Sequence, residues 1–151
     1  MDWWDRPRLG LLVLRISLGL VFLLHGLMKF FGGEISFVRE MLLMAGWAVP
    51  EPLLWLAAVI EVICGTALLL GVFARLAAWL LAVEMIVAVV LFHLRQGFFI
   101  VAVPNVPLAY GFEYHLTLIG GLICLALSGP GAGTLSNAIN PSTGQAPRRA
   151  G

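Results

Sequence analysis

Four long apolar stretches, separated by short polar connections, dominate the hydropathy pattern of the chain. They cover residues 9–31, 53–72, 76–94 and 112–127, and each approaches or reaches the roughly 20 residues that cross a bilayer core of about 30 Å. Within them Leu, Val, Ile and Ala follow one another without the two-residue alternation of a barrel strand, and backbone polar groups in lipid must be satisfied internally. The pattern therefore predicts an all-α integral membrane protein, a bundle of four transmembrane helices.

The composition agrees with a membrane location and excludes a water-soluble fold. Of the 151 residues, 61% are hydrophobic and 11% are charged, and the mean hydropathy is +1.00. Soluble domains are roughly half apolar and about 25% charged. The net charge of +1 offers no basic surface to a nucleic acid. We therefore expect the lipid bilayer to surround this chain, and no nucleic acid partner.

Basic residues in the connections predict the orientation in the membrane. Five of them share one side of the bundle and three lie toward the other: Arg6, Arg8, Arg75, Arg148 and Arg149 against Lys29, Arg39 and Arg95. Because Lys and Arg accumulate in cytoplasmic connections, both termini are predicted to be cytoplasmic. Residues 1–135 would form the transmembrane domain, and residues 136–151, rich in Gly, Pro, Ser and Ala, a flexible cytoplasmic tail.

The two connections on the predicted outer side are more apolar than aqueous loops usually are. Residues 32–52 carry apolar side chains at helical spacing, which predicts a short amphipathic helix on the membrane interface: Ile35, Val38, Met41, Leu42 and Ala45. Residues 96–111 contain Pro104 and Pro107, which prevent a continuous helix. We expect this second connection to dip into the interface or to fold over the mouth of the bundle.

Ionisable side chains in the spans are the main candidates for function. A charged residue at the centre of a spanning helix costs roughly 2.5–3.5 kcal/mol on insertion scales, so such residues are expected to face the interior and to be paired. The candidates are Arg15, His25, Lys29, Glu61, Glu84, His93 and Glu113. The rise along each helix places Arg15, Glu61 and Glu84 deepest. This predicts an outward-opening polar funnel with Arg15 and Glu61 paired at its base.

Helical periodicity of about 100° per residue indicates which of these side chains share a face. Three predicted interior stripes combine ionisable residues with small ones, which let helices approach closely. They are Arg15, Gly19, Phe22, Gly26 and Lys29 in the first span, Ala57, Glu61, Gly65 and Leu68 in the second, and Glu113, Thr117, Gly120 and Cys124 in the fourth. In the third span, Glu84 and His93 are nine positions apart and hence on opposite sides of a regular helix. At most one of them is expected to point at the bundle axis.

The main candidates also have a structural interpretation. Arg15, Glu61 and Glu113 could form an ion-pair network that holds the helices together, instead of a ligand or electron-transfer site. His25 and His93 could bond to their neighbours at the interface, instead of exchanging protons with a ligand. Because His25, His93 and Glu113 lack the close spacing of a metal motif, no metal site is predicted.

Four further residues have open roles. Glu84 could snorkel, pair with Arg95 or contact another subunit. Cys64 and Cys124 could form a redox pair at a common depth, although thiols in apolar surroundings are usually inert. His115 is expected to face headgroups or loop backbone.

The combined pattern resembles the DoxX family over about residues 9–135. The resemblance rests on Arg15 followed by a glycine, His25-Gly26 with Lys29 one turn on, Glu61 four residues before Gly65, Leu70-Gly71, His93 near the end of the third span, Glu113-Tyr114 opening the fourth, and Gly129-Pro130-Gly131. It implies a small four-helix protein of the bacterial inner membrane. Some relatives are subunits of thiosulfate:quinone oxidoreductases, others belong to thiol and oxidative-stress systems, and eukaryotic relatives include a receptor-assembly chaperone.

The resemblance implies the membrane subunit of a quinone-linked oxidoreductase, which is not a complete enzyme alone. The expected catalytic residues are His25, His93 and Glu61, and the expected ligand-binding residues are Arg15, Lys29, Glu113 and Tyr114. The resemblance makes a quinone the candidate cofactor, and the chain has no haem, flavin or NAD motif. Expected partners are other membrane or redox subunits, or further copies in a homo-oligomer. Two alternatives are a non-catalytic scaffold or assembly subunit of a larger membrane complex, and a small-molecule transporter.

Overall fold

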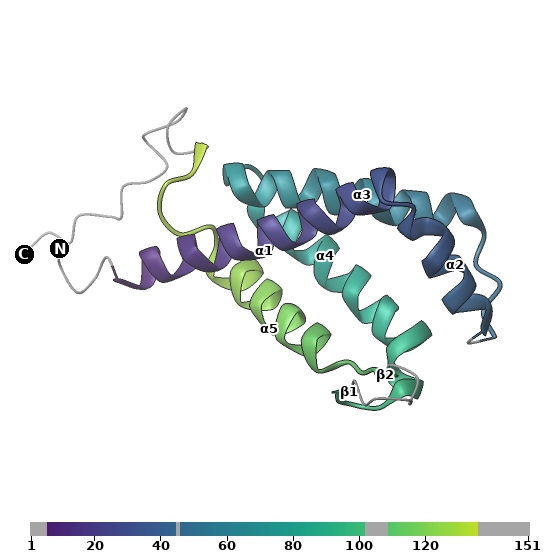
Figure 1. The fold of residues 1–151 in the computed structure, drawn as a ribbon. Coiled ribbons are helices and arrows are strands. Elements are labelled where there is room, and N and C mark those ends of the chain that lie inside the picture. The colour runs from purple at the N-terminus through teal and green to yellow at the C-terminus, as the bar shows by residue number, and fades with distance from the viewer. Residues whose placement is uncertain (1–5, 45, 102–108, 136–151) are drawn as a thin grey trace, which may run out of the picture.

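The computed structural model describes residues 6–44, 46–101 and 109–135, and most of them lie in helices (Figure 1). The helices are α1 (Arg6–Phe31), α2 (Glu34–Met44), α3 (Glu51–Leu70), α4 (Ala74–Ala88) and α5 (Glu113–Ser128). A π-helical segment, Val89–His93, and a 3₁₀ turn, Leu94–Gln96, continue directly from α4. Two short strands, β1 (Ile100–Val101) and β2 (Ala109–Tyr110), which the sequence did not predict, pair antiparallel before α5. The predicted tail, Pro104, Pro107 and Ala45 lie outside the described residues.

The chain is a helical membrane protein. Three helical segments are long and apolar enough to cross a bilayer, namely α1, α3 and the run from Ala74 to Gln96, whereas α5 is a shorter apolar helix. Their outward faces are apolar too, since the side chains of Val13, Ile63 and Val83 are more than half exposed. Helices that are hydrophobic all round belong in a hydrophobic environment. The prediction of apolar spanning helices is therefore confirmed for three segments.

The helices form two pairs, α1 with α3 and α4 with α5 (Figure 1). Glycines let α1 and α3 touch at the backbone: a Cβ on Gly65 would lie 2.6 Å from the Leu23 nitrogen, and one on Gly26 would lie 2.7 Å from Val62 Cγ2. The predicted interior stripes of the first two spans are confirmed, because all their members are buried or half-buried.

The predicted interior stripe of α5 is wrong. Thr117, Gly120 and Cys124 are exposed, and a Cβ on Gly120 would meet no atom within 4 Å. The buried face instead carries Leu118, Leu122, Leu125 and Ala126. Leucines bury more apolar area than glycine or threonine, so they are favoured where helices need not approach at the backbone.

A tight turn joins α3 to α4 and makes the two helices antiparallel. Pro52 lies in the first turn of α3, where a backbone N–H would have no acceptor within the helix, so its absence in proline costs no hydrogen bond. Gly71 ends the helix with φ 70° and donates its N–H to the Leu68 carbonyl, while Val72 donates to Ala67. This left-handed cap suits glycine because it has no Cβ to clash.

The two helix pairs diverge toward the end of the molecule that carries α2 and the β1–β2 ribbon (Figure 1). There Ile35 and Leu42 of α2 are buried together with Leu54 and Ala58 of α3. The predicted short helix with an apolar face is therefore present. Its location on a membrane interface stays a prediction.

Candidate functional site

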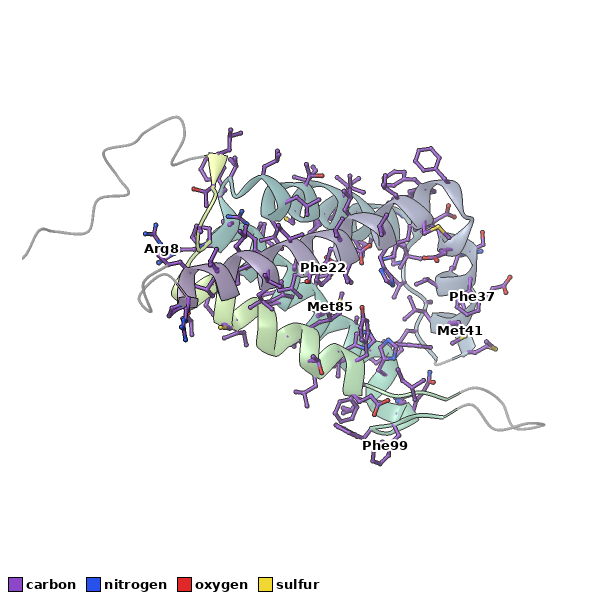
Figure 2. The ribbon with its side chains drawn as sticks, turned by 60° about the vertical axis from the view of Figure 1, so that its left-hand side comes forward. Arg8, Phe22, Phe37, Met41, Met85 and Phe99 are labelled. Atoms are coloured by element: carbon purple, nitrogen blue, oxygen red, sulfur yellow. The ribbon has the colours of Figure 1, made fainter. Side chains whose placement is uncertain are left out.

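A cavity of about 520 Å³ lies between the two helix pairs, at the end where they diverge. Side chains from all five helices and from the base of the β1–β2 ribbon line it, and most of them are apolar. Figure 2 shows Phe22 of α1 and Met85 of α4 between the pairs, with Phe37 and Met41 projecting from α2. Ligand pockets in proteins usually enclose about 300–1,000 Å³, so this cavity can hold a small molecule.

The polar side chains of the cavity include five of the seven predicted site residues. The polar lining residues are His25, Lys29, Glu61, Glu84, His93, Tyr114 and His115. Arg15 and Glu113 are absent from this described lining, while Glu84 and His115 were not among the predicted site residues. The sequence therefore found most of the polar surface, although it assigned no role there to two of its members.

A buried ion pair lies in the cavity wall and joins α1 to α3. The Lys29 ammonium donates to Glu61 Oε2 over 2.6 Å, and the Glu61 side chain is only 4% exposed. The predicted pairing of Arg15 with Glu61 is wrong. The two helices are antiparallel and place Gly26 against Val62, a register that brings Lys29, one turn further on, to Glu61.

Arg15 lies at the other end of the bundle. Its guanidinium is buried and donates to the carbonyl oxygens of Pro130, over 3.0 Å, and Gly133, over 2.8 Å. A Cβ on Gly71 would fall within 2.5 Å of Arg15 Nη1, which places the guanidinium beside the turn between α3 and α4. The five donors of arginine suit a cluster of backbone carbonyls. Arg15 therefore fastens the segment after α5.

Glu113 lies beside the ribbon that closes one side of the cavity. Its Oε1 accepts a hydrogen bond from the Ile100 backbone nitrogen over 3.2 Å, and its own backbone nitrogen donates to the Phe98 carbonyl. These bonds fix the strand connection against the start of α5. Ile100 and Gly111 then line the cavity, which agrees with a connection folded over the bundle mouth.

The His25 ring has a defined proton position. Its Nδ1 lies 2.9 Å from the Val21 carbonyl oxygen. Because a carbonyl oxygen only accepts, Nδ1 carries the proton, and Nε2 of the neutral ring is an acceptor. The ring can thus accept a hydrogen bond at Nε2, or donate one when doubly protonated.

His93 and Glu84 line the same cavity, although a regular α-helix would turn them apart. The π-helical segment Val89–His93 explains the difference, because its i→i+5 bonds accommodate one extra residue. Eight α-helical steps leave two side chains about 80° apart, whereas nine leave them about 180° apart. The expectation that the two residues lie on opposite sides is therefore wrong, and its cause is local helix geometry.

His115 is the cavity residue that the sequence did not place in the interior of the bundle. Its ring packs on His93, with centroids 3.9 Å apart and planes inclined by 37°, and Tyr114 contacts its edge. The expectation that His115 faces headgroups or loop backbone is wrong, because it lines the cavity. The signal was present in the sequence: His115 precedes Leu118 and Leu122 at helical spacing, on the buried face of α5.

Glu84 contributes a second carboxyl near the Lys29–Glu61 pair. It interacts electrostatically with both members, and its Oε2 is buried without a hydrogen-bond partner in the described part of the chain. The guanidinium of Arg95, one of its predicted partners, lies 5.9 Å above the Trp47 ring. Glu84 therefore faces the cavity instead of snorkelling toward the membrane surface.

The two cysteines lie in different surroundings. Cys64 is buried in the helix core and Cys124 is exposed, and both are free thiols. This placement does not support the redox pair considered from the sequence. Within the described ranges, no three His, Cys, Asp or Glu side chains are grouped as metal ligands.

Comparisons with known proteins connect the chain to membrane proteins. The family model described as DoxX matches residues 10–94. An uncharacterized Haemophilus influenzae protein is 37% identical over 82% of this chain and 86% of its own length. An uncharacterized membrane protein of Mycobacterium tuberculosis is 33% identical over 87% of this chain and 82% of its own. A Bacillus subtilis protein named "Putative oxidoreductase CatD" is 32% identical over 80% of each chain. No solved structure matches significantly.

Proposed function

Because the chain belongs to the DoxX family, we propose that it is the membrane subunit of a quinone-linked oxidoreductase, whose cavity binds the head group of a lipid quinone. The observation that carries this proposal is a largely apolar cavity between the helices with histidine, lysine and carboxyl side chains in its wall. The name of the Bacillus subtilis relative, "Putative oxidoreductase CatD", supports this proposal.

The residues of the cavity fit a quinone. Apolar walls such as Phe22, Leu54 and Met85 suit the ring and the isoprenoid chain. Carbonyl oxygens need donors, and the Lys29 ammonium has three N–H groups, of which the bond to Glu61 uses one. The donor set therefore suits a molecule with an apolar body and hydrogen-bonding oxygens.

The side chains would hold the ligand and handle protons. A bound quinone supplies two-electron redox chemistry, for which a partner subunit would provide or take the electrons. His25 and His93 are suited to hold or move a proton, because each imidazole ring has one nitrogen that can donate a hydrogen bond and one that can accept it. Glu61 keeps the Lys29 ammonium in the cavity wall through their ion pair.

We also propose that α5 is a fourth span and that α2 lies on the outer interface. Arg6, Arg8 and Arg75 lie at the end of the bundle opposite the cavity, which the positive-inside rule assigns to the cytoplasm. The protein would then cross the bacterial inner membrane with its cavity in the outer half. A lipid ligand could reach such a cavity from within the bilayer.

The test is a titration of the full chain in lipid nanodiscs with a short-chain ubiquinone analogue. We expect saturable binding by the wild type and a loss of about tenfold in affinity for His25→Ala, since a hydrogen bond to a ligand is worth roughly one factor of ten. Glu51→Gln, at the exposed start of α3, is the matched surface control and should bind as the wild type does. Undiminished binding by His25→Ala, or none by the wild type, would overturn the proposal.

A non-catalytic scaffold is the second candidate, and the buried Lys29–Glu61 pair supports it because that pair also ties α1 to α3. Glu61→Gln separates the two. If the variant loses its fold in detergent while the surviving fraction binds the quinone analogue normally, the ion pair is structural. If the folded variant loses ligand affinity, the quinone site is favoured.

A further inference from the structure

Two side chains that line the cavity each carry a buried polar atom without a hydrogen-bond partner in the described part of the chain: Glu84 Oε2 and His115 Nδ1. Buried polar groups are almost always satisfied, and each exception needs a cause. A third such atom, Arg15 Nε, belongs to the guanidinium that fastens the segment after α5. The two atoms of the cavity have no such structural role.

The two unsatisfied atoms belong to side chains at different levels along the helices, because nine residues, a rise of roughly 12 Å, separate Glu84 from His93, on which His115 stacks. Glu84 comes from α4, close to the Lys29–Glu61 pair with which it interacts. His115 comes from α5 and stacks on His93, which follows the π-helical segment. A ligand with one oxygen could therefore satisfy one of these atoms only, whereas a ligand with two separated oxygens could satisfy both.

We propose that Glu84 and His115 bind two separate oxygen atoms of the ligand, so that the cavity selects an amphipathic ring bearing two such oxygens over one with a single hydroxyl. This inference rests on the proposed quinone function and assigns it two further ligand-binding residues.

The chemistry of both groups suits a ligand that alternates between carbonyl and hydroxyl forms. A carboxyl group accepts a hydrogen bond from a hydroxyl when ionised and donates one to a carbonyl when protonated. An imidazole nitrogen does the same as its tautomer or charge changes. Glu84 and His115 therefore have the chemistry to bond both the oxidised and the reduced ring.

The experiment measures three probes on the full chain in lipid nanodiscs by isothermal titration calorimetry. The probes are a decyl-substituted quinone, 4-decylphenol and decylbenzene, which carry two, one and no head-group oxygens. The variants Glu84→Leu and His115→Phe each replace one of the polar side chains by an apolar side chain of similar size. Glu84→Gln keeps a donor and an acceptor, and Glu51→Leu is the matched control outside the cavity.

We expect Glu84→Leu and His115→Phe each to lower the affinity for the quinone about tenfold, since each variant lacks one hydrogen bond to the ligand. The affinity for 4-decylphenol should fall in only one of these two variants, and the affinity for decylbenzene should fall in neither. Glu84→Gln should retain most of the quinone affinity, and Glu51→Leu all of it. If Glu84→Leu does not fold, Glu84→Met gives the same test.

The possible failures are distinguishable. Quinone binding that neither removal weakens overturns the two-oxygen contact and leaves the proposed function standing. An equal loss for all three probes also overturns it, because a damaged cavity and not a lost hydrogen bond would explain that result. A wild type that binds no quinone overturns both proposals.

Discussion

The Lys29–Glu61 ion pair shows how an apolar helix bundle can hold charges in the wall of a cavity. The pair is nearly fully buried on the carboxylate side and joins two helices that glycines bring into close contact. Removing one member of a buried pair leaves an uncompensated charge, whereas removing both does not. The energetic value of the pair is therefore best measured by comparing single and double variants.

We predict that Lys29→Met and Glu61→Met each destabilise the protein by about 3–5 kcal/mol, and that the double variant loses much less. Unfolding in detergent, followed by circular dichroism, measures these differences. Glu51→Met is the control, because this carboxylate is exposed at the start of α3. A double variant as unstable as the sum of the singles would contradict the account of the pair.

Close contact between α1 and α3 depends on glycine at defined positions. We predict that Gly65→Ala destabilises the protein by about 1–3 kcal/mol, because the new Cβ would fall within 2.6 Å of the Leu23 nitrogen, an atom of the backbone that cannot turn away. Gly120→Ala in α5 has open space around it and should be neutral or stabilise by up to about 1 kcal/mol. Equal effects at both positions in the same unfolding assay would contradict this packing.

The π-helical segment brings His93 to the side of Glu84. Deleting Val90, whose side chain is exposed, would remove the extra residue and let the segment become α-helical with His93 still facing the cavity. We predict that the deletion retains quinone affinity within about threefold, whereas one alanine inserted after Val90 turns His93 by about 100° and abolishes binding. Loss of binding in the deletion variant with an intact fold would contradict this role.

The arrangement of the whole molecule predicts which segments are accessible from each side of the membrane. In a background without Cys64 and Cys124, Glu40→Cys on α2 should react with an impermeant maleimide on intact spheroplasts. Phe73→Cys in the turn after α3, and Leu135→Cys after α5, should react only after lysis. If the cysteine at position 135 is labelled from outside and the one at position 73 is not, α5 does not cross the membrane. If the cysteine at position 73 is labelled from outside and the one at position 40 only after lysis, the orientation is opposite to the one proposed.

The sequence predicts three spanning helices correctly because length and hydropathy decide them, whereas the crossing of the shorter α5 stays a prediction. It predicts the stripes of α1 and α3 because glycines mark close backbone contacts there. Small residues misled the interpretation of α5, where Gly120 faces outward and leucines provide the contact. Small size permits close packing but does not require it.

The pairing of charges could not be predicted, because it depends on the register between helices. A shift of three or four turns decides whether Glu61 meets Arg15 or Lys29, and hydropathy does not report that shift. His93 and His115 were harder still. Their contact requires the extra residue of a π-helical turn, which has no clear pattern in the sequence, and the leucine face of α5, where His115 lies at helical spacing from Leu118 and Leu122.

The central claim, a quinone site between the helix pairs, is tested most directly by photo-crosslinking. The full chain in nanodiscs is irradiated with an azido-substituted quinone, digested and mapped by mass spectrometry. The account predicts labelling of cavity-lining residues, which excess unlabelled quinone suppresses: Leu91, Phe92, His93, Tyr114, His115 and Leu118. Labelling of outward-facing residues such as Leu76 and Leu127 that the competitor does not suppress would contradict it.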